Sequence, residues 1–277
     1  MNATTRPAIA VYAALAVALV GLTARPALAQ FQPRPLGNPA VGENFHIEGF
    51  AGFWNPDSDI TIAVEGLGQN PTNINLKTDL GATDSRVGEM RLVLRPAAKH
   101  KFRLNYTPLK WEQSATLVRD VVFNGQKYTL TLPVQSLLDW KAWRFGYEYD
   151  FIRRDRGFGG VIVEAKYTDV TAQLSNSLVT EFARARAPIP AIGGIARVYP
   201  VPNVGITFEM TGFKLPESIN EDYKARYIDW DLYGTLNLTD NVGAQVGYRS
   251  LDLSYLISDY AGTMVLKGIY FGIVARY

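Results

Sequence analysis

The sequence predicts an all-β fold, a transmembrane antiparallel up-and-down β-barrel of about ten strands behind a cleaved signal peptide. Three features lead to this prediction. Apolar and polar residues alternate over segments of strand length, short connections alternate with long ones, and no segment after residue 29 has the period of a helix. Together they predict a sheet that closes on itself and presents one face to lipid.

Residues 1–29 have the layout of an export signal. Arg6 supplies the positive start, an apolar run extends from Ala8 to Leu22, and Ala27-Leu28-Ala29 is a small-x-small cleavage site. The alternative, an uncleaved anchor helix, is disfavoured because the apolar run is shorter than the ~20 residues that a span needs. We therefore expect a signal peptide (1–29), a short periplasmic segment (30–42) and an outer-membrane-type barrel (43–277).

The composition excludes several kinds of protein. The chain has no cysteine, which rules out a lipoprotein anchor, disulfides and thiolate sites. Arg6 and Arg25 account for the formal net charge of +2, so the remaining chain is neutral. A nucleic-acid-binding protein would carry a basic stripe. We expect no nucleic-acid partner.

Alternation with a period of two defines the strands, because successive side chains of a strand point to opposite faces. Residues 136–152 show this clearly, with Trp143 and Phe145 on one face and Arg144 and Glu148 on the other. In the first strand the pattern places Phe45 toward lipid and His46 toward the lumen. The predicted strands are 44–55, 85–96, 101–114, 136–152, 158–171, 191–199, 204–213, 225–238, 242–255 and 265–277.

The connections fit an up-and-down barrel, which has short periplasmic turns and longer outer loops. The short turns are predicted at 97–101, 153–157, 200–203 and 239–241. The long loops are predicted at 56–84, 115–135, 172–190, 214–224 and 256–264. Within the first of these, Ile60, Ile62 and Val64 also alternate. Pairing them with residues 74–80 would give twelve strands, but an external hairpin is favoured.

The C-terminal strand resembles that of bacterial outer-membrane β-barrel proteins, including the small OmpX and OmpW type. Ile269, Phe271 and Ile273 share one face and the chain ends on Tyr277. In this superfamily such an ending is a signal to the barrel-assembly machinery. The resemblance implies a location in the bacterial outer membrane, periplasmic chaperones during biogenesis, and contact with outer-membrane lipid and lipopolysaccharide. It implies no cofactor and no catalytic residue.

Some barrels that this chain resembles are enzymes, namely lipid A deacylases and phospholipases with Ser and His, and omptin proteases with Asp and His. Their reactive groups lie toward the outer leaflet. The two histidines here, His46 and His100, are predicted at the periplasmic end. Asp229 and Asp231 lie roughly 7 Å apart on one strand face and could divide acid and base roles. Pairing within the lumen is the favoured interpretation, and no catalytic, cofactor-binding or metal-binding residue is predicted.

Inward-facing charges are numerous and balanced, with eight acids and eight bases. Charges in a narrow lumen are stable when they are paired, so we expect a filled interior. The predicted lumen charge network consists of Glu48, Glu89, Arg91, Arg95, Arg103, Arg144, Glu148, Asp150, Glu164, Lys166, Arg197, Glu209, Asp229, Asp231, Arg249 and Arg276.

Aromatic and basic residues outside that set suggest contacts with the membrane. Trp111, Trp140, Trp143 and Trp230 are predicted as interfacial girdle residues. Arg184 and Arg186, on an external loop or its descending edge, either hold lipopolysaccharide phosphates or are solvated.

Three functional classes follow. A non-catalytic barrel with a structural or surface-interaction role in the envelope is favoured by the balanced inward charges. A narrow porin-like channel for small solutes is the alternative, and a lipid-modifying enzyme is the third.

Overall fold

The computed structural model describes residues 40–64, 72–117, 119–129, 133–177, 179–215, 223–257 and 260–277. The predicted signal peptide and most of the predicted periplasmic segment lie outside the described residues. Within the described part, no helix is long and apolar enough to cross a membrane.

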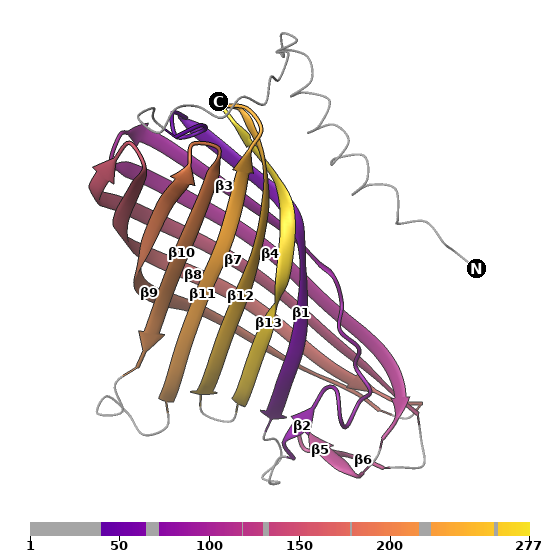
Figure 1. Cartoon of the computed structure of the whole chain (residues 1–277). Coiled ribbons are helices and arrows are strands. Elements are labelled where there is room, and N and C mark those ends of the chain that lie inside the picture. The colour runs from indigo at the N-terminus through magenta and orange to yellow at the C-terminus, as the bar shows by residue number, and fades with distance from the viewer. Residues whose placement is uncertain are drawn as a thin grey trace. The chain divides into compact units, whose positions relative to one another are not determined.

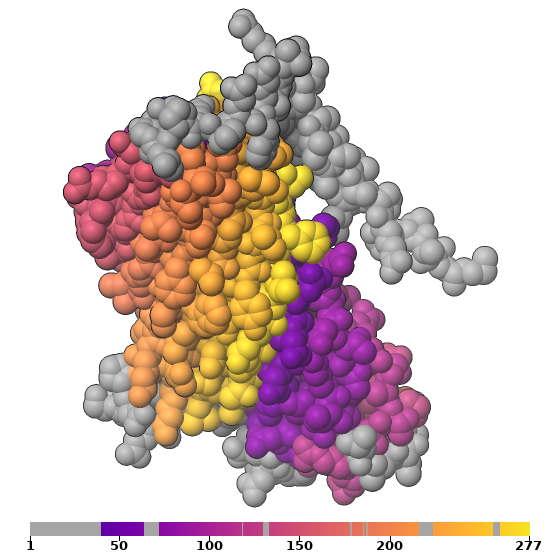
Figure 2. Space-filling view, in the orientation of Figure 1, coloured from indigo at the N-terminus to yellow at the C-terminus, as the bar shows by residue number. Residues whose placement is uncertain are grey.

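Ten antiparallel strands form a closed barrel (Figure 1), because the last strand pairs with the first from Glu48↔Arg276 to Val64↔Tyr260. Figure 2 shows this seam, where the yellow C-terminal strand lies against the indigo N-terminal strand. The barrel strands are β1 (Ile47–Val64), β3 (Val87–Ala97), β4 (His100–Thr116), β7 (Pro133–Arg154), β8 (Gly157–Ser175), β9 (Thr180–Val201), β10 (Val204–Lys214), β11 (Tyr223–Asn237), β12 (Val242–Ile257) and β13 (Tyr260–Arg276). The predicted fold class is confirmed, with ten strands in the barrel.

The predicted outer loop 56–84 begins later than expected. β1 runs without interruption through Ile60 and Ile62 to Val64, and it stays paired with β13 along this length. The short strand β2 (Ile74–Asn75) folds back on its outer end, where Ile74 pairs with Ile62. The favoured external hairpin is therefore present as an extension of β1, and the twelve-strand alternative is wrong.

Two other predicted loops are also mostly strand. β8 continues to Ser175 and β9 begins at Thr180, so residues 172–175 and 180–190 form the outer end of a long hairpin. β12 and β13 likewise leave only residues 258–259 between them where a loop over 256–264 was predicted. In both places the strands continue beyond the membrane, where polar side chains can point outward.

Among the described residues, the outer end of β9 has no strand on the β10 side, because its last pair with β10 is Ile192↔Gly212. Pro188 and Pro190 lie in this unpaired stretch. Proline has no N–H to donate, so it fits a free edge and discourages pairing with another chain.

Side-chain polarity reverses along the strands. In the part of β7 nearer the short turns, apolar Phe145 points outward and charged Arg144 points inward. Toward the other end, past Ala142, charged Lys141 points outward and apolar Trp140 points inward. The same reversal occurs on β4, β8 and β13. We call the part of the barrel with an apolar outer surface the membrane zone. The part on the side of β2, β5 and β6 is the outer zone. We call the short-turn end the periplasmic end, after the orientation that such barrels commonly take.

Aromatic side chains mark the boundary between the zones. Tyr106, Trp143 and Tyr167 are aligned across three neighbouring strands, and the Tyr106 and Trp143 ring centroids lie 4.3 Å apart. Trp230 and Tyr248 lie 5.7 Å apart on β11 and β12. This arrangement is typical of an interfacial aromatic girdle, as predicted for Trp143 and Trp230.

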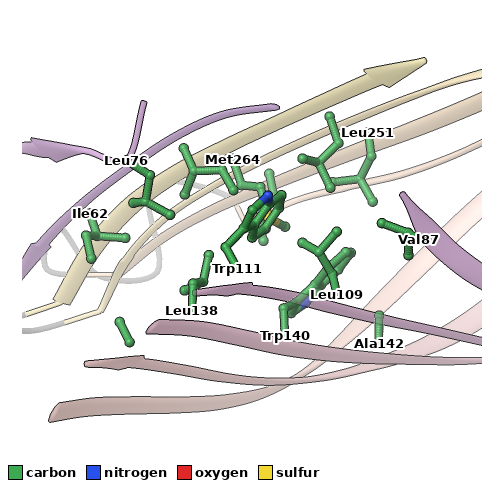
Figure 3. Close-up of a cluster of buried hydrophobic side chains, with 14 of the residues drawn as sticks. Ile62, Leu76, Val87, Leu109, Trp111, Leu138, Trp140, Ala142, Leu251 and Met264 are labelled. Carbon is green, nitrogen blue, oxygen red and sulfur yellow. The ribbon is translucent and has the colours of Figure 1, made fainter. Parts of the chain in front are cut away.

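The girdle prediction is wrong for Trp111 and Trp140. Both are buried inside the outer zone, at 6% and 2% relative exposure. Figure 3 shows their place in an apolar cluster built from facing walls. Its members include Leu109, Trp111, Leu138, Trp140, Leu251 and Met264. Both side chains occupy inward-facing positions of their strands. In the outer zone it is the inward face of the strands that is shielded from water.

A hairpin and a loop cover this cluster. The hairpin of β5 (Val121–Phe123) and β6 (Gln126–Tyr128) is inserted between β4 and β7. The Tyr128 hydroxyl donates to the Leu174 carbonyl over 3.0 Å, and Val122 N–H donates to Thr72 Oγ1 over 3.0 Å. The cover is thus bonded to the wall and to the loop before β3.

Candidate functional site: the barrel interior

The structure places all sixteen residues of the predicted lumen charge network inside the barrel. Fifteen are buried, and the Glu48 side chain is 13% exposed. Thirteen of them take part in ion pairs with described residues. The other three are Arg91, Arg95 and Asp231.

The layer nearest the periplasm is organised around Lys101 and Arg103 of β4. Lys101 Nζ lies 2.6 Å from Glu148 Oε1 and 2.9 Å from Asp150 Oδ2. The Nη atoms of Arg103 lie 3.1 Å from Glu148 Oε2 and 2.6 Å from Glu209 Oε2. These contacts tie β4, β7 and β10 together through the lumen.

A second layer surrounds Asp229 of β11. Its Oδ2 lies 2.8 Å from Arg249, 3.2 Å from Arg144 and 3.4 Å from Lys166. Arg144 also lies 3.0 Å from Glu164. The interior charges therefore form continuous chains of opposite sign.

Two further pairs complete the set at its edges. Arg249 Nη1 lies 3.3 Å from Glu89, and Arg276 Nε lies 2.5 Å from Glu48. Buried charges of this kind are stable only with such partners.

The three remaining residues use other contacts. Arg91 donates to Gln245 over 2.8 Å and lies over the Phe50 ring at 4.8 Å. Arg95 donates to the Ala98 carbonyl over 3.0 Å. Asp231 Oδ2 accepts from the Tyr270 hydroxyl over 3.0 Å, while its Oδ1 is buried without a hydrogen bond.

Two charged members of the interior, Lys101 and Glu43, were not predicted from the sequence. Lys101 was assigned to a turn, but β4 already begins at His100, and Lys101 has the inward parity of Arg103. That parity was visible in the sequence. Glu43 precedes the first strand, so no periodicity could place it. With these two residues the network, as far as the structure describes it, has nine acids and nine bases.

Glu43 belongs to residues 40–46, which we call the strap because they cross the periplasmic end of the barrel. Ala40 N–H donates to the Asp155 carbonyl over 3.1 Å, and Val41 N–H donates to the Pro202 carbonyl over 2.9 Å. Gly42 N–H donates to Asp240 Oδ1 over 3.1 Å. The strap is therefore bonded to three different periplasmic turns.

Side chains of the strap insert among the interior charges. Glu43 Oε1 lies 2.9 Å from Arg197 and accepts a hydrogen bond from Tyr199. Burial alone would raise the pKa of Glu43, but Arg197 and Tyr199 outweigh it and hold that pKa below its ordinary value. The Phe45 ring lies between two arginines. Its centroid is 5.3 Å from Cζ of Arg95 and 5.9 Å from Cζ of Arg276.

The predicted facing of Phe45 and His46 is therefore wrong. Phe45 is buried and His46 is exposed. The strand begins only at Ile47, so the strand alternation does not extend back to these two residues. The His46 ring stays near the rim, with Nδ1 3.4 Å from the Arg95 carbonyl oxygen.

The chain's other histidine also lies at the periplasmic end. His100 is the first residue of β4, and its Nδ1 lies 2.6 Å from the Tyr147 hydroxyl. A nucleophile in the outer zone would need a base within hydrogen-bond reach. Both histidines of the sequence are thus at the opposite end from the outer leaflet.

Asp229 and Asp231 do not form an acid and base pair in this arrangement. Asp229 is held by three cations and accepts from the Tyr227 hydroxyl over 3.0 Å. Asp231 has only the Tyr270 hydroxyl as a partner among the described residues. Side chains fill the space around them.

Two of the spaces inside the wall are small. One between Glu48, Arg91 and Arg103 measures about 20 Å³, and one between Leu76 and Leu138 about 10 Å³. Such volumes hold about one water molecule. A cavity of about 540 Å³ opens at the outer mouth, lined by the outer ends of strands and their connections, including Ile62, Leu215 and Tyr255.

Solved structures with a similar fold include bacterial outer-membrane barrels. The outer membrane protease OmpT of Escherichia coli matches with a TM-score of 0.53 and 8% identity, over 87% of this chain and 99% of that one. The chain has the fold of a bacterial outer-membrane β-barrel. This likeness confirms the predicted fold, a closed antiparallel barrel of the kind found in bacterial outer membranes.

Other similar structures have lower scores. The toluene transporter TodX of Pseudomonas putida has a TM-score of 0.35 at 8% identity, over 87% of this chain and 93% of that one. The attachment invasion locus protein Ail of Yersinia pestis has a TM-score of 0.33 at 8% identity, over 82% and 97%. No family model matches the chain, and no curated protein matches it in sequence.

Proposed function

We propose that this outer-membrane barrel is non-catalytic and closed, and that its role in the envelope is structural or is exerted through its outer surface. The observation that carries this proposal is the occupied interior. The strap crosses the periplasmic end, paired charges fill the membrane zone, and an apolar cluster fills the outer zone.

Each level opposes the passage of a solute for a different physical reason. Separating a buried ion pair leaves uncompensated charges, which typically costs about 3–5 kcal/mol. Opening the apolar cluster would expose Trp111, Trp140 and their neighbours to water. Ten strands enclose little more than side chains in any case. A narrow porin-like channel is therefore the weaker proposal.

The outer zone offers a rigid surface for a partner. Its wall consists of strand extensions, and Asn124 of the hairpin donates to Glu181 of β9 over 2.9 Å. Lys77 lies 2.9 Å from Asp84 and also contacts Asp57, while Arg119 lies 2.8 Å from Asp79. The Arg119 hydrogen bond holds the pKa of Asp79 below its ordinary value. A surface held in place this way loses little conformational entropy on binding.

Electrical recording tests the closed interior. The purified full-length barrel is reconstituted into planar bilayers, with an open porin as the positive control for the assay. We expect no stepwise conductance above the bare bilayer. Regular single-channel steps from the parent protein would overturn the proposal in favour of the channel.

Assays with lipopolysaccharide, phospholipid and peptide test the absence of catalysis, and we expect no hydrolysis of any of them. Hydrolysis that disappears in an Asp229→Asn, Asp231→Asn double variant, while that variant still migrates as a folded barrel, would show that the lumen carboxylates catalyse a reaction.

A further inference from the structure

One sector of the membrane boundary carries cations where two other sectors carry Tyr and Trp. On β1 and β13 the outward apolar series ends at Phe53 and Ile269. The next outward positions are Asn55 on β1 and Lys267 on β13, and Arg86 precedes β3 on the other side of β1. The two cations therefore flank β1 at the height where lipid headgroups begin.

The Arg86 side chain is already oriented. Its Nε donates to Asn55 Oδ1 over 2.9 Å, and its guanidinium lies 5.8 Å from the Phe53 ring centroid and 6.0 Å from that of Phe271. Phe53 and Phe271 are themselves paired across the seam. Among the described residues no group accepts a hydrogen bond from the Arg86 Nη atoms, so the outer edge of the fork is open to an anion.

Lys267 is exposed and has no carboxylate within ion-pair distance among the described residues. Asp57 stands opposite it on β1. That carboxylate is bound by Lys77, which also lies 2.9 Å from Asp84. Lys77 thus engages both Asp57 and Asp84, and neither Arg86 nor Lys267 forms an ion pair in the described part of the chain.

Outward cations on the neighbouring strands β4, β7 and β9 are, by contrast, paired with acids. Lys110 lies 3.1 Å from Glu112, and Lys141 lies 3.0 Å from Asp139. Asp169 takes both arginines singled out in the sequence, at 2.6 Å from Arg184 and 3.2 Å from Arg186. A lipid phosphate at Arg184 and Arg186 would compete with this carboxylate.

We propose that Arg86 and Lys267 form a binding site for the phosphate of an outer-leaflet lipopolysaccharide, with its acyl chains along Phe53, Phe271 and Ile269. Arginine binds phosphate through parallel N–H donors, and the platform of two rings fixes the plane of the fork. The lysine supplies a second positive charge across β1. The site joins a charged contact at the boundary to the apolar wall below it.

Binding of diphosphorylated lipid A to the full barrel in detergent micelles, followed by native mass spectrometry, tests the site. We expect the Arg86→Gln, Lys267→Gln double variant to bind at least tenfold more weakly than the parent. The matched control, Lys110→Gln, Lys141→Gln, removes the same charge from paired cations and should bind as the parent does. Equal binding by the parent and both variants would overturn the proposal.

Two further measurements distinguish phosphate recognition from general lipid adhesion. The parent barrel should bind dephosphorylated lipid A only weakly, about as weakly as the double variant binds phosphorylated lipid A. If the parent instead bound both lipids with equal affinity, the contact would be with the acyl chains alone. Phosphatidylglycerol binding as tightly as lipid A would overturn the lipopolysaccharide assignment. Heat-dependent gel migration verifies that each variant is folded, and Arg86→Lys, which keeps the charge without the fork, should lose part of the affinity.

Discussion

Two features of a residue's position decide what its side chain contacts. One is its parity, that is, whether it occupies an inward-facing or an outward-facing position of the strand, and the other is its height along the barrel axis. Parity sets whether the side chain faces the interior. Height sets whether the interior at that level is charged or apolar. Lys166 and Leu174 share one face of β8, yet Lys166 contacts Glu164 and Asp229 while Leu174 packs in the apolar cluster. The same parity therefore supports opposite chemistry within one strand.

Two glycines on the barrel wall should respond differently to an added methyl group. A Cβ on Gly193 of β9 would overlap the Met210 carbonyl oxygen, whereas a Cβ on Gly88 of β3 would meet nothing within 4 Å. Gly193→Ala should lower the free energy of unfolding in lipid vesicles by about 1–3 kcal/mol. Gly88→Ala is the control and should stay within about 0.5 kcal/mol of the parent. Similar losses in both would show that the close approach of β9 and β10 is not as described.

Adjacent residues of β11 test the inward and outward assignment. Leu232 is 47% exposed on the lipid face, and Asp231 is buried with the Tyr270 hydroxyl as its partner. Leu232→Arg should cost about 2–4 kcal/mol in vesicle unfolding measurements. Asp231→Asn should be milder, because no ion pair is lost and an amide can still accept from Tyr270. The reverse order of the two effects would mean that the faces are exchanged.

Periodicity in the sequence was sufficient to place the sixteen lumen charges on the inner face, since a two-residue period needs no knowledge of distant contacts. It could not place Phe45 and Glu43, because both precede the first strand and are held by tertiary contacts with Arg95 and Arg197. Trp111 and Trp140 were misplaced for another reason. Their inward parity was visible, but tryptophans near strand ends suggested a girdle, and the membrane boundary lies lower than those positions.

At the scale of elements, the strap is held by its charge and by backbone bonds to three turns. The pKa of Glu43 is lowered in the folded barrel, so its contribution is present above its ordinary pKa of 4.5 and is lost as the pH falls through the folded value. A nitroxide on Asn44→Cys, an exposed strap position, reports this by electron paramagnetic resonance. The label should be immobile at neutral pH and become mobile below pH 4.5.

Glu43→Gln should give the mobile spectrum already at neutral pH, since Arg197 then lacks its carboxylate. The same label on Asn241→Cys, in the turn between β11 and β12, serves as the control and should not change with pH. A strap label that stays immobile in Glu43→Gln would show that the backbone bonds alone hold the strap.

The two ends of the barrel should differ in their access to a reagent outside the cell. Lys127 lies exposed in the β5–β6 hairpin, and Asn241 lies in a short turn at the other end. Because the chain has no cysteine, Lys127→Cys and Asn241→Cys each introduce a single thiol. An impermeant maleimide should label Lys127→Cys in intact cells and Asn241→Cys only after the outer membrane is opened. Labelling of Asn241→Cys in intact cells would reverse the orientation.

The existence of the ten strands was predictable, while their lengths were not. Within the membrane zone the outward face is apolar, which makes the alternation easy to detect. Asp169 and Arg186 lie on the outward face of β8 and β9 above the boundary, where the polarity is reversed. A polar outward face and an inward face of small alanines resemble a loop composition, so the sequence suggested loops where the strands continue.

At the scale of the whole molecule, one barrel wall has two zones in which the polarity of the inner and outer faces is opposite. The membrane zone has a polar interior and an apolar exterior, while the outer zone has the apolar interior and polar exterior of a soluble β-protein. On β7 the change occurs within two residues, between Lys141 and Trp143. Each zone therefore depends on a different driving force, with hydrophobic burial stabilising the outer zone.

Trp140 and Trp143 test this division, since they are three residues apart and only the first is in the outer core. Trp140→Ala should remove about 3–5 kcal/mol of packing from the outer zone and leave insertion of the membrane zone intact. In vesicles with the outer zone exposed, proteinase K should then cleave the outer strand extensions and leave a protected membrane fragment. Trp143→Ala, which faces lipid, should leave the outer zone as resistant as in the parent.

Trp140→Phe provides the size control. The indole N–H of Trp140 is buried without a hydrogen bond, so phenylalanine removes an unsatisfied donor while keeping most of the ring. This variant should resist proteinase K nearly as well as the parent. If Trp140→Ala were as resistant as Trp140→Phe, the outer zone would be held by its strand pairing and ion pairs alone. If Trp140→Ala instead failed to insert, the two zones would fold as one unit.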